Sequence, residues 1–174
     1  MARPIVTPTD TERTFAEDDI IVSKTDAKGI ITYANKVFLD IADYEEEEVL
    51  GQPHNLIRHP DMPRCIFKLL WDTLQAGSEI FAYVKNMTKH GDFYWVFAHV
   101  TPSFDASGTI TGYHSNRRVP RREALAVIEP LYKNLRATEE SAAGPRDGLQ
   151  AACDNFSALL TEKKMAYDEF IFSF

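Results

Sequence analysis

Cysteine is scarce in this 174-residue sequence, which contains only Cys65 and Cys153. The two cysteines lie far apart and form neither a CxxC pair nor a spacing typical of metal ligands, so no metal site built on them is expected. We expect both to be plain thiols in apolar surroundings. A chain of this length also needs no covalent staples, because it can bury roughly two-thirds of its unfolded surface.

Long apolar runs and an excess of positive charge are lacking as well. No segment approaches the ~20 apolar residues that a membrane-spanning helix needs, and residues 1–19 lack the apolar segment of a signal peptide. The net charge is −7, whereas a nucleic-acid-binding protein usually presents a net basic face. Arg117, Arg118, Arg121 and Arg122 form only a local basic group. These absences predict a cytoplasmic protein with no membrane and no nucleic-acid partner.

Recognisable catalytic motifs are also missing. The sequence contains no glycine-rich phosphate loop, nucleophile elbow, kinase motif or cyclase motif. The acidic run Glu45–Glu48 does not predict a metal site, because consecutive residues point to different sides of a helix. We therefore expect a protein that is not an enzyme.

The residues that are present predict, first, a β-hairpin and a short helix. β-Branched residues in Ile20–Thr25 and Ile30–Ala34 favour two strands, and the segment Asp26–Gly29 between them has the composition of a turn. Asn35 is a favourable N-cap for a helix over residues 36–42. A second short helix is expected at the acidic run that follows, whose carboxylates suit the positive end of a helix dipole.

The segment Gln52–Pro63 is the most unusual part of the sequence. It contains three prolines in 12 residues, which exclude a regular helix or a central strand. It is also rich in His, Arg, Asp and Asn, and such a loop inside a domain usually lines a site. The residues that follow, Pro63–Ala76, have an amphipathic pattern that predicts a helix.

Strand signals dominate the next part of the sequence. The predicted strands are Ile80–Met87, Phe93–Phe104 and Thr109–Arg118. The middle strand has apolar residues on both faces, so both faces are expected to be covered. Its aromatic stripe of Phe93, Trp95 and Phe97 is expected to lie under the C-terminal helices, with a dimer surface as the alternative.

The C-terminal third predicts two helices joined by a loop of small residues. The helices are expected at Arg121–Thr138 and Leu149–Lys164, with the loop at Ser141–Gly148. Pro130 lies inside the first helical pattern and is expected to kink it. The phenylalanines at the end of the chain are too apolar for a free tail, so we expect them to pack.

This order of elements resembles that of a PAS domain, and three segments match more closely. Gly51–Pro63 resembles the flavin-loop motif of bacterial aerotaxis-receptor PAS domains, and Val84–Val96 and Gly112–Arg118 resemble strands of the same group. The resemblance covers about Ile20–Arg118 and is not expected to extend to Arg121–Phe174. It implies an α+β PAS fold, with a five-stranded antiparallel sheet, helices on one face and a C-terminal helical extension.

The resemblance divides the chain into three regions and implies a function. The regions are a flexible N-terminal arm (1–19), a PAS sensor domain (20–119) and a helical extension (120–174). Domains of this type hold FAD non-covalently and report redox or oxygen state. The absence of an encoded effector domain implies a signalling protein as partner, in a chemotaxis or regulatory complex, and homodimers are common among PAS domains.

Individual residues carry the implied cofactor site. Arg58, His59 and Asp61 match positions that this family needs for flavin binding, Asn35 and Asn86 match polar cavity positions, and Trp71 matches a tryptophan beside the cofactor. From their chemistry, Asn35, Asn55 and Asn86 can supply amide groups to the ring, and Arg58 can supply a fork-shaped donor to the phosphates. The alternative for Arg58 is a structural salt bridge with Asp61.

Three alternatives to FAD stay open at this stage. A haem-based gas sensor would need an axial histidine, for which His54 or His59 is best placed. A cofactor-free interaction module is favoured by Ile80, Phe81 and Ala82, which stand where the family often has Trp-Ser-Gly and which predict a narrower pocket. A receptor for another small ligand is the third alternative.

Overall fold

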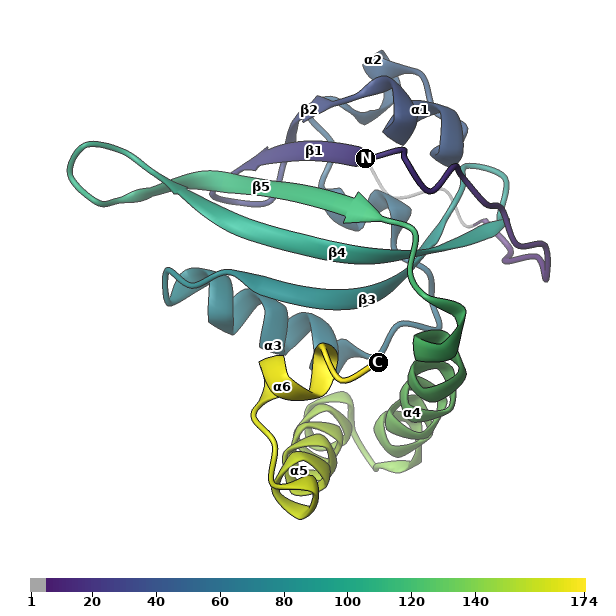
Figure 1. Ribbon diagram of the computed structural model, residues 1–174, viewed down its shortest axis with the longest axis vertical. Helices are drawn as coiled ribbons and strands as arrows, with labels where there is room; N and C mark the ends of the chain where they lie inside the picture. The colour runs from purple at the N-terminus through teal and green to yellow at the C-terminus, as the bar shows by residue number, and fades with distance from the viewer. Residues whose placement is uncertain (1–5) are drawn as a thin grey trace.

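The computed structural model describes residues 6–174 and contains one antiparallel sheet and seven helical segments (Figure 1). In chain order, the elements are β1 (Ile21–Asp26), β2 (Ile31–Ala34), α1 (Lys36–Ala42), α2 (Glu46–Val49), the 3₁₀ helix η1 (His54–Ile57), α3 (Arg64–Gln75), β3 (Ile80–Met87), β4 (Phe93–Phe104), β5 (Ile110–Arg118), α4 (Arg122–Ser141), α5 (Pro145–Lys163) and α6 (Tyr167–Ile171). The predicted order of strands and helices is confirmed.

The five strands are arranged in the order β2-β1-β5-β4-β3, and all neighbours are antiparallel. β1 and β2 form the predicted hairpin. Asp26 Oδ1 accepts hydrogen bonds from the backbone N–H groups of Lys28 and Ile30 in its turn, and Gly29 adopts the positive φ of 80° that a side chain would disfavour. In this strand order the last strand, β5, lies beside the first strand, β1, at the centre of the sheet.

Successive side chains of a strand point to opposite faces of the sheet, and different elements cover the two faces. The face covered by η1 and α3, called the inner face below, carries Ser23, Val84, Ala98 and Arg117. The outer face carries Phe81 and the aromatic stripe of β4. Most of the core lies between the inner face and the helices, where Phe38, Ile57 and Tyr94 are fully buried.

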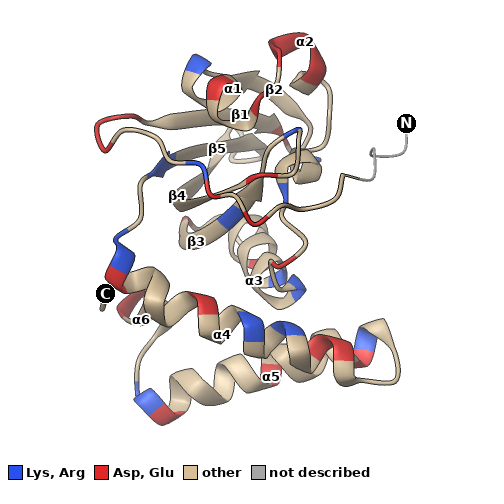
Figure 2. Cartoon of the chain, turned by 90° about the vertical axis from the view of Figure 1, so that its right-hand side faces the viewer, with Lys and Arg blue, Asp and Glu red and all other residues tan. Residues whose placement is uncertain are grey.

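The extension lies along the β3 edge of the sheet, with α4 and α5 side by side (Figures 1 and 2). The Tyr132 hydroxyl donates a hydrogen bond to the carbonyl oxygen of Tyr83 (2.8 Å), and the Tyr167 hydroxyl donates to that of Phe81 (2.7 Å). Unpaired carbonyl groups of an edge strand would otherwise attract another chain. The extension therefore closes an edge that the PAS sheet leaves open.

The aromatic stripe of β4 lies partly under the extension. The rings of Trp95 and Tyr132 are 6.2 Å apart, and Phe97 packs edge-on against Phe172 at 5.9 Å. Phe170 and Ile171 are buried, so the expectation that the apolar C-terminus packs is confirmed. Phe172 keeps 55% of its surface exposed although it touches the stripe.

One expectation about a connecting segment is wrong. The predicted loop at Ser141–Gly148 is shorter, because α5 begins at Pro145, a residue that suits the first turn of a helix. Gly148 lies within this helix, and a Cβ atom there would approach the Glu139 carbonyl oxygen to 2.1 Å. The glycine therefore reflects close packing of α5 against α4 and not a loop.

The predicted flexible arm is held against the domain over its described residues, while residues 1–5 lie outside them. The backbone N–H of Arg13 donates to the Phe93 carbonyl oxygen (2.7 Å). The Arg13 guanidinium forms ion pairs with Asp43 (2.6 Å) and Asp92 (3.1 Å). Hydrogen bonds to the start of β4, which the sequence pattern does not reveal, thus hold the arm.

Candidate functional site

A cavity of about 350 Å³ lies between α3 and the inner face of the sheet. Its apolar lining includes Phe67, Leu70, Trp71 and Leu74 from α3 and Val84, Ala98 and Val100 from the sheet. Its polar lining includes Ser23, Thr25, Lys28, His54, Asn55, Arg58, Lys68, Asn86, Tyr113, Ser115 and Arg117. A mostly apolar slot with a few polar groups is the usual form of a small-molecule site.

The charges around this cavity are all of one sign. Lys28, Arg58, Lys68 and Arg117 line it, and none of the described lining residues is an aspartate or glutamate. Lys68 is paired from outside the cavity by Asp72, at 2.6 Å. In a chain with a net charge of −7, this concentration of cations favours an anionic ligand.

The floor of the cavity carries a buried arginine that sequence analysis did not select. Arg117 is 3% exposed, and its Nη2 donates hydrogen bonds to Ser23 Oγ (2.6 Å) and His54 Nε2 (2.7 Å). Burial lowers the pKa of Arg117 to about 10. Burial, and then the Arg117 charge, lower the pKa of His54 to about 3, so at neutral pH the imidazole is neutral and accepts at Nε2.

Four of the predicted site residues lie in the lining of this cavity. These are Asn55, Arg58, Trp71 and Asn86. Asn86 is 4% exposed on the inner face of β3, and Trp71 meets Tyr113 edge-on at 5.3 Å. Asn55 is exposed in η1, so it belongs to the mouth of the cavity and not to its interior.

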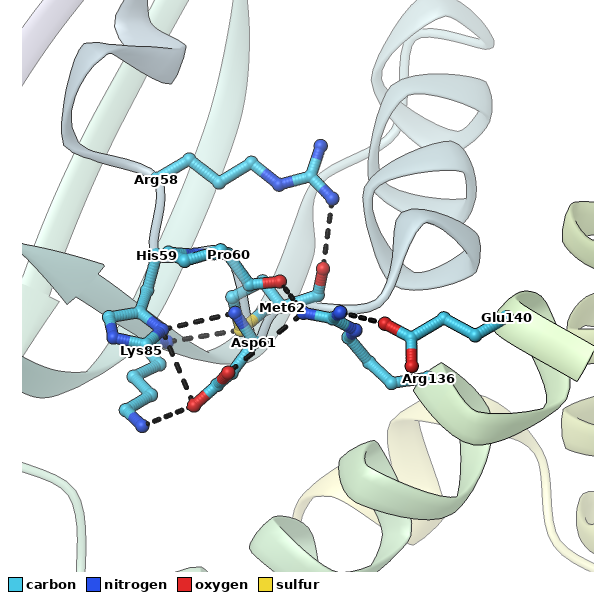
Figure 3. A network of polar contacts seen from close by, with 8 residues as sticks. All are labelled: Arg58, His59, Pro60, Asp61, Met62, Lys85, Arg136 and Glu140. Atoms are coloured by element: carbon cyan, nitrogen blue, oxygen red, sulfur yellow. Dashed lines mark hydrogen bonds and ion pairs between the residues drawn. The ribbon is translucent and has the colours of Figure 1, made fainter. Parts of the chain in front are cut away.

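Arg58 is held by the cavity wall rather than by Asp61. Its Nη2 donates to the Met62 carbonyl oxygen at 2.9 Å (Figure 3). Its guanidinium lies 4.4 Å from the centre of the Phe67 ring. The acid partner expected as an alternative, Asp61, pairs instead with Lys85 at 2.7 Å. Partial burial tends to raise the pKa of Asp61, but the ion pair with Lys85 outweighs this effect. The pKa of Asp61 therefore lies below its ordinary value.

His59 and Asp61 are not among the described residues that line the cavity, and they shape the loop behind it. His59 Nδ1 accepts a hydrogen bond from the Asp61 N–H (3.0 Å). Arg136 of α4 donates to the Pro60 carbonyl oxygen and also pairs with Asp61 and Glu140 (Figure 3). The loop that supplies Arg58 is therefore fastened to β3 on one side and to the extension on the other.

Asn35 lies away from the cavity, in the N-cap position that the sequence also predicts. Its Oδ1 accepts from the N–H groups of Phe38 and Val22 (both 3.0 Å), and its Nδ2 donates to the Ile20 carbonyl oxygen (2.8 Å). These three bonds engage both the oxygen and the nitrogen of the side-chain amide, so Asn35 joins β1 to α1.

The expected narrowing of the pocket by Phe81 does not occur. Phe81 lies on the outer face of β3, where its ring stacks on His99 at 4.1 Å and on Phe97 at 5.8 Å. Ala82 points to the inner face but is not among the lining residues. The departure from the family's Trp-Ser-Gly pattern therefore leaves the cavity intact.

The two histidines considered for haem are both engaged in contacts. His54 lines the cavity, but its Nε2 accepts from Arg117 and lies 2.9 Å from Ser23 Oγ. His59 is 2% exposed and packs edge-on against Phe93 at 6.1 Å. Within residues 6–174, no group of three or more His, Cys, Asp or Glu side chains is placed to hold a metal ion.

Cys65 and Cys153 are both free thiols. Burial, and then the nearby Glu139 carboxylate, raise the pKa of Cys65 to about 12. The thiol is therefore un-ionised at neutral pH, as expected for a cysteine in apolar surroundings.

Comparison with known proteins places the fold in a family. Residues 31–117, half of the chain, match the family model described as the PAS fold. This chain belongs to the PAS-fold family. The match spans β2 to β5 and therefore includes the loop, α3 and three of the strands that form the cavity.

Two curated relatives are larger proteins. The chain is 42% identical over 140 residues to the aerotaxis receptor of Escherichia coli K12, a match that covers 80% of this chain and 27% of the receptor. It is 29% identical over 99 residues to a nitrogen fixation regulatory protein of Klebsiella pneumoniae, covering 57% of this chain and 20% of that protein. The chain spans about a quarter of the length of these relatives or less.

The match to the aerotaxis receptor corrects the expected extent of the resemblance. Only 120 residues precede Arg121, so a match that covers 80% of the chain includes part of the extension. The distinctive motifs all lie in the PAS domain, whereas the extension shows a helical periodicity that many proteins share. The similarity therefore continues beyond the PAS domain into the extension.

The PAS fold is also evident among solved structures. A light-oxygen-voltage domain studied with a flavin analogue superposes with a TM-score of 0.56 at 19% identity, covering 66% of this chain and 86% of that domain. In residues 6–174, no helix is long and apolar enough to cross a lipid bilayer.

Proposed function

We propose that this PAS domain senses redox or oxygen state through FAD bound non-covalently in the cavity under α3. The observation that carries the proposal is the lining, in which four cations and no described acid surround an apolar slot. FAD combines a flat, mostly apolar ring with a negatively charged pyrophosphate, and both requirements are present. The similarity to an aerotaxis receptor supports the same choice.

The residues of this chain divide the binding task between them. Trp71 and Phe67 offer apolar surface to the ring, and Asn86 offers an amide at its rim. Arg58, which directly follows η1, offers a planar guanidinium to the phosphates. FAD, when bound, supplies reversible uptake of electrons, which no side chain in the cavity provides.

Three of the predicted site residues that do not line the cavity hold this arrangement in place. His59 and Asp61 fix the loop that supplies Arg58, while Asn35 joins the start of β1 to α1. Each of them therefore supports the proposed site without lining it.

The signal leaves the cavity through contacts with the extension. Arg136 binds the loop at Pro60, and Glu139 accepts hydrogen bonds from the N–H groups of Arg64 and Cys65 at the start of α3. A change in the preferred position of the loop or of α3 therefore changes the packing of α4. Such a shift requires the two redox states to favour different packings. The protein that receives the signal is a signalling protein of a chemotaxis or regulatory complex in the cytoplasm. The proposed sensor acts as a homodimer.

The haem alternative is less well supported, because the one histidine in the described lining already accepts from Arg117. A cofactor-free interaction module is a second alternative. It would leave the cation-lined cavity without a role.

The test is the absorption spectrum of the purified full chain, followed by titration of flavin-free protein with FAD and with riboflavin. We expect a flavin spectrum that bleaches on reduction, and tighter binding of FAD than of riboflavin, which lacks phosphates. Arg58→Met should weaken FAD binding roughly tenfold, since a charge-assisted hydrogen bond is worth about 1.5–3 kcal/mol, and should affect riboflavin less. Arg146→Met, at an exposed position of α5, is the matched control.

The same measurement separates the alternatives. A Soret band would assign the cavity to haem. A colourless protein that binds neither FAD nor haem would leave the interaction module.

A further inference from the structure

The floor of the cavity is formed by polar residues of the two central strands. β1 contributes Ser23 and Thr25, and β5 contributes Ser115 and Arg117. Ser23 faces Ser115 directly in the strand register, so the four side chains form one patch on the inner face. Ser23, Ser115 and Arg117 are each less than 8% exposed.

Several of these polar groups have no partner among the described residues. Arg117 Nη1, Ser115 Oγ and Thr25 Oγ1 are buried and make no hydrogen bond within residues 6–174. Buried polar groups in folded proteins are nearly always hydrogen-bonded. Three unmatched groups on one cavity floor therefore indicate an acceptor that the protein itself does not provide.

Arg117 also lacks a counter-ion in the described part of the chain. Its hydrogen bonds go to the neutral acceptors Ser23 and His54, and its guanidinium lies 5.6 Å from the centre of the Phe38 ring. Burying a charge without an opposite charge is costly. Because the pKa remains about 10, the group keeps its charge at neutral pH.

The contacts of Arg117 do not explain its presence on structural grounds. Ser23 Oγ and His54 Nε2 lie 2.9 Å apart and can bond to each other without it. An apolar side chain at position 117 would therefore leave neither of them without a partner.

We propose that Arg117, with the hydroxyl groups of Ser115 and Thr25, binds the electron-accepting ring of the ligand and favours its negatively charged reduced form. This inference rests on the proposed flavin function. Two electrons from a low-potential carrier, dithionite in the assay, and one proton taken up at ring nitrogen N5 give the ring one net negative charge. Arg117 stays protonated throughout and stabilises that charge, so it raises the reduction potential of the bound flavin.

The experiment compares the full chain with Arg117→Met, Arg117→Lys and Arg118→Met. Arg118 is the matched control, because it is the next residue of β5 and is exposed. Three quantities are measured: the denaturation midpoint of flavin-free protein, the dissociation constant of FAD, and the midpoint potential of bound FAD in a dithionite titration against a reference dye.

We expect opposite effects on stability and on binding. Flavin-free Arg117→Met should be at least as stable as the unaltered chain, while its FAD affinity falls at least tenfold. The reduced form should lose at least tenfold more affinity than the oxidised form, which corresponds to a potential lower by about 30 mV for a two-electron couple. Arg117→Lys, which keeps the charge, should lower the potential by less than Arg117→Met does. Arg118→Met should change neither the FAD affinity nor the potential.

Two results would overturn the inference while the flavin function stands. Unchanged affinity and potential in Arg117→Met would remove Arg117 from the ring. A clear loss of stability in flavin-free Arg117→Met, absent in Arg118→Met, would make Arg117 a structural residue. Failure of the unaltered chain to bind any flavin would instead remove the proposed function, and it would be seen before a variant is made.

Discussion

Polar groups are buried both on the floor of the cavity and where Glu139 and Tyr132 of the extension contact the PAS domain, but several of those on the floor have no partner in the described part of the chain. In the cavity, Arg117 Nη1 and two hydroxyl groups have no partner among residues 6–174. At the contact, Glu139 is 7% exposed, and its carboxylate accepts hydrogen bonds from the backbone N–H groups of Arg64 and Cys65. Tyr132 likewise reaches a backbone carbonyl oxygen.

This difference separates a surface built for stability from one built for a ligand. A satisfied polar contact stabilises the fold, whereas an unsatisfied one lowers stability and is retained where it serves binding. Substitutions should therefore have opposite consequences in the two regions: loss of stability at the contact, and loss of ligand binding on the cavity floor.

The largest effect is expected at Glu139, where the comparison is easiest to break. Glu139→Gln removes the charge and places an amide NH₂ group against the N–H donors at the start of α3. We expect the free energy of unfolding to fall by about 2–3 kcal/mol, the range for hydrogen bonds to charged groups and unmatched buried donors. Chemical denaturation of the full chain measures this.

Glu129→Gln provides the control, because Glu129 is exposed on the same helix. It should change the unfolding free energy by less than about 0.5 kcal/mol. Equal effects of the two substitutions would show that the contact does not depend on the buried carboxylate.

Much of the fold could be predicted because its signals are local. The turn at Asp26–Gly29, the N-cap at Asn35 and the strand alternation of Phe93–Phe104 each depend on residues close in sequence. The start of α5 was missed because the small residues around Gly148 are typical of a loop. The tertiary approach to Glu139 explains the glycine at position 148.

The site could be predicted only where a motif marked it. Arg58, Trp71 and Asn86 lie in segments with a recognisable pattern, and they line the cavity. Arg117 was read as part of a local basic group because its role depends on the pairing of β5 with β1, about ninety residues away in sequence. The signal was present, since Arg117 shares a strand face with Tyr113 and Ser115. The partner strand could not be read from it.

A second prediction sharpens the cavity side through pH. His54 has a pKa of about 3 in the folded protein, owing to burial and then Arg117, and an ordinary value of about 6.5 in the unfolded chain. Between these values only the unfolded chain binds the proton, so stability falls as the pH drops below about 6.5. The contribution approaches about 1.4 kcal/mol per pH unit.

His54→Gln should remove this part of the pH dependence between about pH 7 and about pH 5. His90→Gln, at an exposed turn position, should not. Denaturation midpoints of the three proteins across that range provide the measurement. The same slope in all three would mean that the proton reaches His54 in the folded state and that burial and Arg117 do not hold it neutral.

The smallest effect is expected from hydroxyl groups at the β3 edge. Tyr132→Phe leaves the ring beside Trp95 but removes the donor to the Tyr83 carbonyl oxygen, and about 1 kcal/mol of stability should be lost. Tyr33→Phe, at a position that is 44% exposed, should be nearly neutral. If the two substitutions cost the same, water must replace the lost donor at the β3 edge. The Tyr132 hydroxyl would then add nothing to the stability of the contact, and the extension would be held by its apolar packing and by the polar contacts of Glu139, Arg136 and Tyr167.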